Sequence, residues 1–118
     1  MIVDDEEVVL KILSLQLQDK GWDVEAINDP VEALEKFKEK PTAMVLLDIS
    51  MPKMNGVDLS KELRALSPEL IVIFMTGYPT MDIAIEGLET GAYDYLVKPF
   101  RIEQLYMVVD REIGRAHV

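Results

Sequence analysis

Apolar runs alternate five times along the chain with stretches in which apolar residues recur at helical spacing. Residues 43–47 and 70–75 are unbroken apolar runs, which are typical of strands buried on both faces. Shorter apolar runs at residues 1–3 and 95–97 indicate two more strands, and alternating apolar and charged side chains at residues 22–27 indicate a third. An amphipathic stretch follows each strand, so the pattern predicts five strand–helix units.

The predicted helices have recognisable ends and apolar faces. Gly21 is suited to follow the end of the first helix, and Asp29 is a predicted N-cap of the second. A fourth helix is expected between Pro79 and Gly91, and a fifth from about Ile102. The first helix is predicted to bury a broad apolar face, made of Val8, Val9, Ile12, Leu13, Leu15 and Leu17.

Strands that alternate with helices pair in parallel through right-handed crossovers, which places helices on both faces of the sheet. We therefore predict an α/β fold of the (βα)5 type, with a doubly wound, parallel five-stranded sheet. The commonest strand order for this pattern is 2-1-3-4-5, and we expect it here. The 118 residues are expected to form one domain. The first strand is so short that we expect it to have lost a few preceding residues.

Composition and charge narrow the possible functions. The net charge of −10 argues against a nucleic-acid surface, because phosphate backbones are bound by basic patches. The chain has no cysteine, hence no disulfide or thiol chemistry, and we expect a cytoplasmic protein. No apolar run approaches the roughly 18 residues of a membrane span. Met1 leads almost directly into acidic residues, which does not fit a signal peptide.

Four predicted strands end in polar side chains: Asp4 and Asp5 after the first, Asp48 after the third, Thr76 after the fourth and Lys98 after the fifth. Each of these has an ordinary explanation on its own, such as a helix cap or a solvated loop. The carboxyl ends of parallel strands, however, all lie at one edge of the sheet, where α/β proteins bind ligands. We therefore expect these side chains to converge.

Their chemistry is that of phosphoryl transfer. Three carboxylates brought together repel one another, so at least one pKa should rise unless a cation neutralises the cluster. Carboxylate oxygens suit Mg²⁺, which keeps several waters and completes its coordination with phosphate oxygens. A carboxylate beside Mg²⁺ and a lysine is a competent nucleophile toward phosphorus. Phosphoryl transfer needs mainly positioning and charge neutralisation, which Mg²⁺, Lys98 and Thr76 would supply.

With the residues around these positions, the chain resembles the receiver domains of two-component response regulators. The likeness spans residues 1–118 and implies a flavodoxin-like receiver fold with no output domain in this stretch. The residues that carry it are Val3, Asp4, Asp5, Glu6, Leu47, Asp48, Met51, Pro52, Asn55, Gly56, Thr76, Gly77, Gly91, Ala92, Tyr95, Lys98, Pro99 and Phe100. Residues 78–80 and 91–96 look most like receivers of enhancer-binding transcription activators.

The resemblance implies a role for each residue of the site. Asp48 would accept a phosphoryl group from the phosphohistidine of a sensor histidine kinase. Asp5 and Asp48 would bind Mg²⁺ directly, with the backbone carbonyl of Ser50, whereas Asp4 would act through water. Lys98 would pair with the phosphoryl group. A protein of this kind is a switch that catalyses its own phosphorylation and dephosphorylation, and is not an enzyme acting on other substrates.

The resemblance also implies how the signal is passed on. Thr76 would be the switch hydroxyl and Tyr95 the switch aromatic. Their movement would change the face built from the fourth helix, the fifth strand and the fifth helix, which would bind a second copy or an output domain. Ser50 and Tyr78 would flank the phosphoryl group, and since neither orients water well, we expect a long-lived phosphorylated state. The peptide bond before Pro99 would be cis, for which proline lowers the energetic cost.

Three other functions are compatible with parts of this pattern. A haloacid-dehalogenase-type aspartyl-phosphate hydrolase also uses an aspartate at a strand end. Its motif, however, is Asp-x-Asp, and this chain has Ser50 in place of the second aspartate. A flavodoxin-like electron carrier needs a phosphate-binding loop where this chain has residues 4–7, which are all acidic. A pure interaction module would not need the site positions filled. We therefore keep the hydrolase as the alternative hypothesis.

Overall fold

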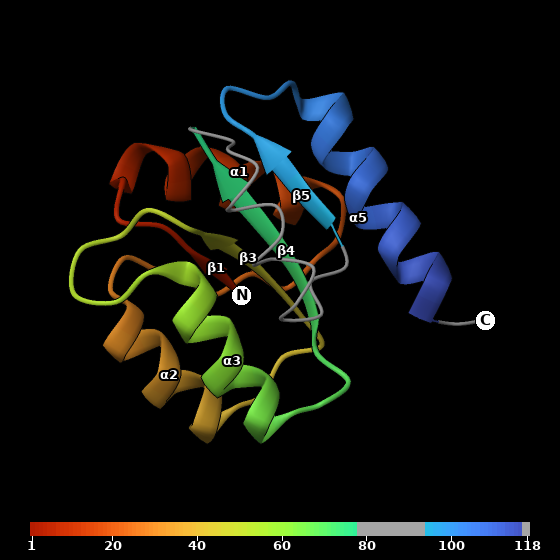
Figure 1. Cartoon of the computed structure of the whole chain (residues 1–118). Helices are drawn as coiled ribbons and strands as arrows, with labels where there is room; N and C mark the ends of the chain where they lie inside the picture. The colour runs from red at the N-terminus through yellow and green to blue at the C-terminus, as the bar shows by residue number, and fades with distance from the viewer. Residues whose placement is uncertain (78–93, 117–118) are drawn as a thin grey trace.

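The computed structural model describes residues 1–77 and 94–116 and contains a five-stranded parallel sheet (Figure 1). The strand order is β2-β1-β3-β4-β5, which confirms the predicted order. The strands are β1 (Ile2–Val3), β2 (Ala26–Ile27), β3 (Met44–Asp48), β4 (Ile71–Thr76) and β5 (Asp94–Val97).

Helices cover both faces of the sheet, as a doubly wound fold requires. In Figure 1, α2 and α3 lie together on one face, with α1 and α5 on the other. Their bounds are α1 (Glu7–Asp19), α2 (Pro30–Glu39), α3 (Gly56–Leu66) and α5 (Ile102–Ala116). The predicted fourth helix lies outside the described residues. Within the described part of the chain, no helix has both the length and the apolar character that crossing a membrane demands.

Two apolar clusters pack against the two faces of the sheet. β4 contributes to both, because successive side chains of a strand point to opposite faces. Val72 and Phe74 join the cluster under α2 and α3, while Ile71, Ile73 and Met75 join the cluster under α1 and α5. All six residues of β4 are buried, as its unbroken apolar sequence predicted. β3 and β4 each pair with strands on both sides, so their carboxyl ends are held within the sheet.

The second strand is shorter than predicted. The alternation at residues 22–27 indicated one strand, but β2 contains only Ala26 and Ile27, and Trp22 is exposed. Among the described residues β2 lies at the edge of the sheet and pairs with β1 alone, and β1 offers just two residues, which pair with Ala26 and Ile27. The Glu25 carbonyl still accepts a hydrogen bond from the N–H of Ile2 at 2.8 Å, but residues 22–25 belong to no strand.

The first helix buries a narrower face than predicted. Its buried residues are Leu10, Leu13 and Leu17, while Val8, Ile12 and Leu15 are exposed. A helix that lies on a sheet buries only one stripe of side chains. Because α1 carries apolar side chains on more than one side, its sequence does not show which stripe is buried. The helix ends where expected, because Gly21 follows it with a φ of +92°.

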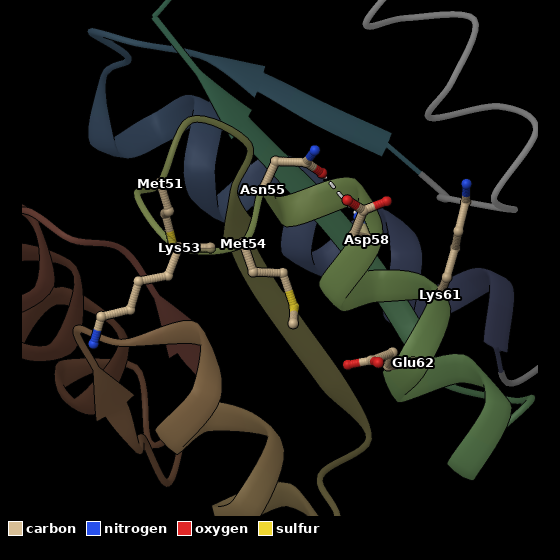
Figure 2. Close-up of a pocket in the computed structure, with 7 residues that line it drawn as sticks. All are labelled: Met51, Lys53, Met54, Asn55, Asp58, Lys61 and Glu62. Carbon is tan, nitrogen blue, oxygen red and sulfur yellow. Dashed lines mark hydrogen bonds between the residues drawn. The ribbon is translucent and has the colours of Figure 1, made fainter.

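The loop between β3 and α3 is held close to the end of β3. Asn55 caps α3, since its side chain accepts a hydrogen bond from the backbone N–H of Asp58 at 2.9 Å (Figure 2). The backbone N–H of Gly56 donates to the Ile49 carbonyl at 2.9 Å. A Cβ atom on Gly56 would lie only 2.2 Å from the carbonyl oxygen of Asp48. The sequence Asn55-Gly56 therefore lets α3 begin directly beside Asp48.

This close approach predicts opposite effects of two glycine substitutions. Gly56→Ala should lower the free energy of unfolding by about 2 kcal/mol, because the new methyl group forces the backbone of Asp48 to shift. Gly114→Ala should raise it by about 0.5–1 kcal/mol, since Gly114 is an exposed helical position with no atom near its Cβ. Urea unfolding of both variants measures the difference. Equal effects would contradict this account of Gly56.

Candidate functional site

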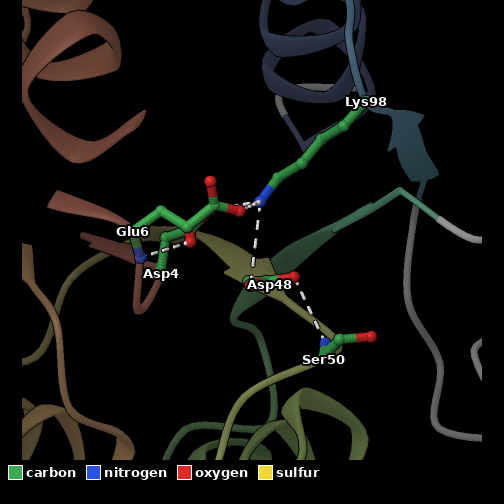
Figure 3. A network of polar contacts seen from close by, with 5 residues as sticks. All are labelled: Asp4, Glu6, Asp48, Ser50 and Lys98. Atoms are coloured by element: carbon green, nitrogen blue, oxygen red, sulfur yellow. Dashed lines mark hydrogen bonds and ion pairs between the residues drawn. The ribbon is translucent and has the colours of Figure 1, made fainter. Parts of the chain in front are cut away.

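The carboxyl edge of the sheet brings the polar residues at the strand ends together (Figure 3). Asp4 follows β1, Asp48 ends β3, Thr76 ends β4 and Lys98 follows β5. An open groove of about 670 Å³ lies at this edge. It is lined by Asp5, Glu6, Asp48, Ser50, Gly77 and Lys98, by Val9, Ile12, Leu13 and Gln16 of α1, and by Pro99 and Phe100.

The Lys98 ammonium lies among three carboxylates. Its Nζ atom is 2.6 Å from Oδ2 of Asp4, 3.6 Å from Oε1 of Glu6 and 3.7 Å from Oδ2 of Asp48. The backbone N–H of Lys98 donates to the carbonyl of Thr76 at 2.7 Å, which fixes where its side chain starts. Burial acts to lower the pKa of Lys98, but the hydrogen bond and charge of Asp4, together with the charges of Asp48 and Glu6, outweigh it. The pKa is therefore raised and the ammonium stays charged.

Asp48 is a buried carboxyl whose charged form is disfavoured. Only 3% of the residue is exposed, and its Oδ1 accepts a hydrogen bond from the backbone N–H of Ser50 at 3.2 Å. Burial, followed by repulsion from Asp4, raises the pKa of Asp48 from 3.8 to about 7. Lys98 and the Ser50 hydrogen bond oppose this rise without cancelling it. Near neutral pH the protonated and charged forms of Asp48 are therefore close in free energy, and a cation that enters the groove would favour the charged form.

Asp4, Asp5 and Glu6 offer oxygen ligands to such a cation. Carboxylate oxygens of the three residues lie within 4.8 Å of one another. Each oxygen of Asp4 already accepts one hydrogen bond, Oδ2 from Lys98 and Oδ1 from the backbone N–H of Glu6 at 2.9 Å. Asp5 is exposed and lines the groove together with Asp48. These hard oxygen donors fit Mg²⁺.

The remaining predicted residues differ in what the structure says about them. Thr76 is buried at the end of β4, next to Lys98, and the Lys98–Pro99 peptide bond is cis, as the resemblance implied. Tyr95 lies in β5 opposite Phe74, with 48% of its surface exposed. Tyr78, which was predicted to flank the phosphoryl group, lies outside the described residues.

Sequence reasoning assigned no role to Glu6, although its carboxylate approaches Lys98 as closely as Asp48 does. Its place directly after Asp4 and Asp5 was the available signal. Acidic side chains at the start of a helix are common, however, because they suit the helix dipole, so this signal had an ordinary explanation. The contact with Lys98 depends on where β5 packs in the sheet, because Lys98 directly follows β5 and lies 92 positions after Glu6 in the chain.

Comparison with known proteins identifies one family over nearly the whole chain. The family model described as the response regulator receiver domain matches residues 1–110. The transcriptional regulatory protein ZraR of Escherichia coli O157:H7 is 35% identical over 118 residues, which is all of this chain but 27% of that protein. The chain therefore spans about a quarter of the length of this relative.

Solved structures of receiver domains share the fold. A CheY-like receiver domain protein from Methanospirillum hungatei JF-1 superimposes with a TM-score of 0.94 at 28% identity, over 98% of this chain and 93% of that one. The beryllofluoride-activated receiver domain dimer of NtrC4 has a TM-score of 0.91 at 31% identity, over 98% of this chain and 95% of that one. These matches confirm the predicted receiver fold, and the match to ZraR supports the predicted likeness to receivers of transcription regulators.

The raised pKa of Asp48 predicts how stability depends on pH without divalent cations. The folded state holds a proton on Asp48 up to about pH 7, and the unfolded state only up to about pH 3.8, so this group's contribution to stability falls between those values. Asp48→Asn removes the titration. The variant should match the wild type near pH 4 and be about 1–3 kcal/mol more stable at pH 8. Urea unfolding with a chelator measures this gap, and a gap independent of pH would contradict the assignment.

Proposed function

Because the chain belongs to the response regulator receiver domain family, we propose that it is a signalling switch that accepts a phosphoryl group on Asp48. The observation that carries the proposal is the placement of Asp48. Its buried carboxylate lines the same groove as Asp5 and Lys98, and Lys98 supplies a cation 3.7 Å away. A carboxylate of this kind has a nucleophilic oxygen, partial charge compensation from Lys98 and a place in the wall of an open groove.

In the proposed reaction an Asp48 oxygen attacks the phosphorus atom of a kinase phosphohistidine. The oxygen–phosphorus bond of an acyl phosphate forms, the nitrogen–phosphorus bond breaks, and the histidine nitrogen keeps the electron pair. Mg²⁺, when bound, neutralises charge on the phosphoryl oxygens. Asp5, Asp48 and the carbonyl of Ser50 would hold this ion. Asp4, with both oxygens already engaged, would act on it through water.

Lys98 and Thr76 would respond to the new charge. A phosphoryl group brings a charge of about −1.5 to −2 and strong acceptor oxygens. Lys98, held by Asp4 in the resting protein, would move its ammonium toward these oxygens. Thr76 lies at the end of the adjacent strand, where its hydroxyl would donate to them and draw its loop inward. A local change of charge would thereby shift a two-state equilibrium of the loop.

The exposed stripe of α1 is suited to bind the sensor histidine kinase. Val8, Ile12 and Leu15 are large apolar side chains left in solvent, and Ile12 also lines the groove that contains Asp48. Phe100 lines the groove from the β5–α5 side. A helical kinase segment carrying the phosphohistidine could cover this apolar surface while presenting its phosphorus atom to Asp48.

The output surface is proposed to lie on β5 and α5. Tyr95 and Val97 of β5 and Met107 of α5 are exposed large hydrophobic residues. The Arg111 guanidinium of α5 pairs with Asp94 of β5, which links the two elements. A second copy of the domain or an attached output domain would cover these residues after phosphorylation. The activated receiver of NtrC4 is a dimer, which supports this part of the proposal.

Intact mass spectrometry tests the acceptor. With Mg²⁺ and acetyl phosphate, the wild type should gain one adduct of about 80 Da, which peptide mapping places on Asp48. Asp48→Asn should gain none, because the nucleophilic carboxylate is gone. Asp58→Asn is the matched control, since Asp58 lies on α3 and does not line this groove.

Two outcomes would contradict the proposal. One is an adduct that persists in Asp48→Asn. The other is rapid release of many equivalents of phosphate without a stable adduct, which would favour the aspartyl-phosphate hydrolase.

Substitution of Thr76 tests the coupling between acceptor and output surface. Thr76→Ala should keep phosphorylation of Asp48 but lose most of the chemical-shift change around Tyr95 that acetyl phosphate causes in the wild type. Thr76→Ser, which keeps the hydroxyl, should retain the response. Two-dimensional NMR with and without acetyl phosphate makes the comparison. Equal responses in Thr76→Ala and the wild type would rule out the hydroxyl as the link.

A further inference from the structure

We propose that Glu6 is a positioning residue that competes with the acceptor site for the Lys98 ammonium. This inference rests on the proposed function and adds a residue that regulates it. In the resting protein Glu6 holds Lys98 back, which limits how readily Asp48 takes up and keeps a phosphoryl group.

The Lys98 ammonium lies near two competing carboxylates, those of Glu6 and Asp48 (Figure 3). Its Nζ atom is hydrogen-bonded to Asp4 at 2.6 Å, and from there it is 3.6 Å from the Glu6 carboxylate and 3.7 Å from the Asp48 carboxylate. Glu6 and Asp48 thus attract the same ammonium from similar distances. A shift of Lys98 toward a phosphoryl group on Asp48 would lengthen its contact with Glu6.

The backbone places Glu6 for this role. Glu6 is the N-cap residue of α1, and its N–H donates to Oδ1 of Asp4 at 2.9 Å. Its carboxylate makes no capping hydrogen bond to the helix, unlike the Asp29 carboxylate, which caps α2. The Glu6 side chain is 63% exposed at the mouth of the groove, and Lys98 is the cation that it contacts. Its ion pair is therefore with the site and not with its own helix.

Two consequences of this charge act in the same direction. Glu6 stabilises the resting position of Lys98, which disfavours the move toward a phosphoryl group. Glu6 also adds a negative charge beside the path of an anionic phosphodonor, which lowers the donor's local concentration. Because the side chain is largely exposed, both effects should be modest and should weaken as salt screens the charges.

The experiment compares Glu6→Gln with Glu7→Gln, which removes the same charge one residue away. Glu7 is a suitable control because its carboxylate accepts a hydrogen bond from Asn28 at 2.5 Å and does not line the groove. The rate of Asp48 phosphorylation by acetyl phosphate at fixed Mg²⁺ should rise by about threefold in Glu6→Gln at low salt. The gain should shrink at high salt. Glu7→Gln should stay near the wild type, and Glu6→Asp should restore part of the restraint.

Urea unfolding and Mg²⁺ titration of each variant separate the alternatives. Slower uptake with weaker Mg²⁺ binding in Glu6→Gln would make Glu6 a metal ligand and overturn the proposal. Equal rates in Glu6→Gln and Glu7→Gln, with Asp48 phosphorylated in both, would overturn this inference alone. A wild type that takes up no phosphoryl group on Asp48 would overturn the proposed function and this inference together.

Discussion

The Lys98 ammonium balances the negative charge that the fold concentrates at one edge of its sheet. Asp4 and Asp48 are both buried there, and isolated buried carboxylates are costly. Lys98 forms a short hydrogen bond with Asp4 but lies 3.7 Å from Asp48. The compensation is therefore uneven: Asp4 has a close partner, whereas the pKa of Asp48 is raised to about 7. The negative charge of Asp48, which we propose to be the acceptor, is therefore only partly compensated.

This incomplete compensation of the Asp48 charge links the stability of the domain to its proposed chemistry. A domain that fully neutralised Asp48 with a close lysine would be more stable but would leave the carboxylate less free to bind a cation and attack phosphorus. The exposed acids at the groove, Asp5 and Glu6, keep the edge negative and draw cations toward it. The neighbouring Gly56 lets α3 start against the backbone of Asp48, which keeps the two elements close together.

The surfaces around the site divide the proposed signalling tasks. The apolar stripe of α1 adjoins the groove, which suits a partner that must reach Asp48. We propose that the exposed residues of β5 and α5 respond to the site through Lys98 and Thr76, whose backbones are hydrogen-bonded where β4 and β5 end. Input and output can therefore use different surfaces while sharing the same few side chains. The relative ZraR is several times longer than this chain.

The sequence by itself determined the parallel sheet and the edge at which polar side chains meet, because buried parallel strands need continuous apolar runs such as those of β3 and β4. The strand order was expected only as the commonest one for this pattern, and the tertiary structure established it. The sequence could not determine the length of β2, which depends on how many residues β1 offers for pairing. Nor could the sequence show which stripe of α1 is buried, since that helix carries apolar side chains on more than one side. The contact of Glu6 with Lys98 was decided only by the tertiary structure, because it joins residues 92 positions apart through the packing of β5 into the sheet.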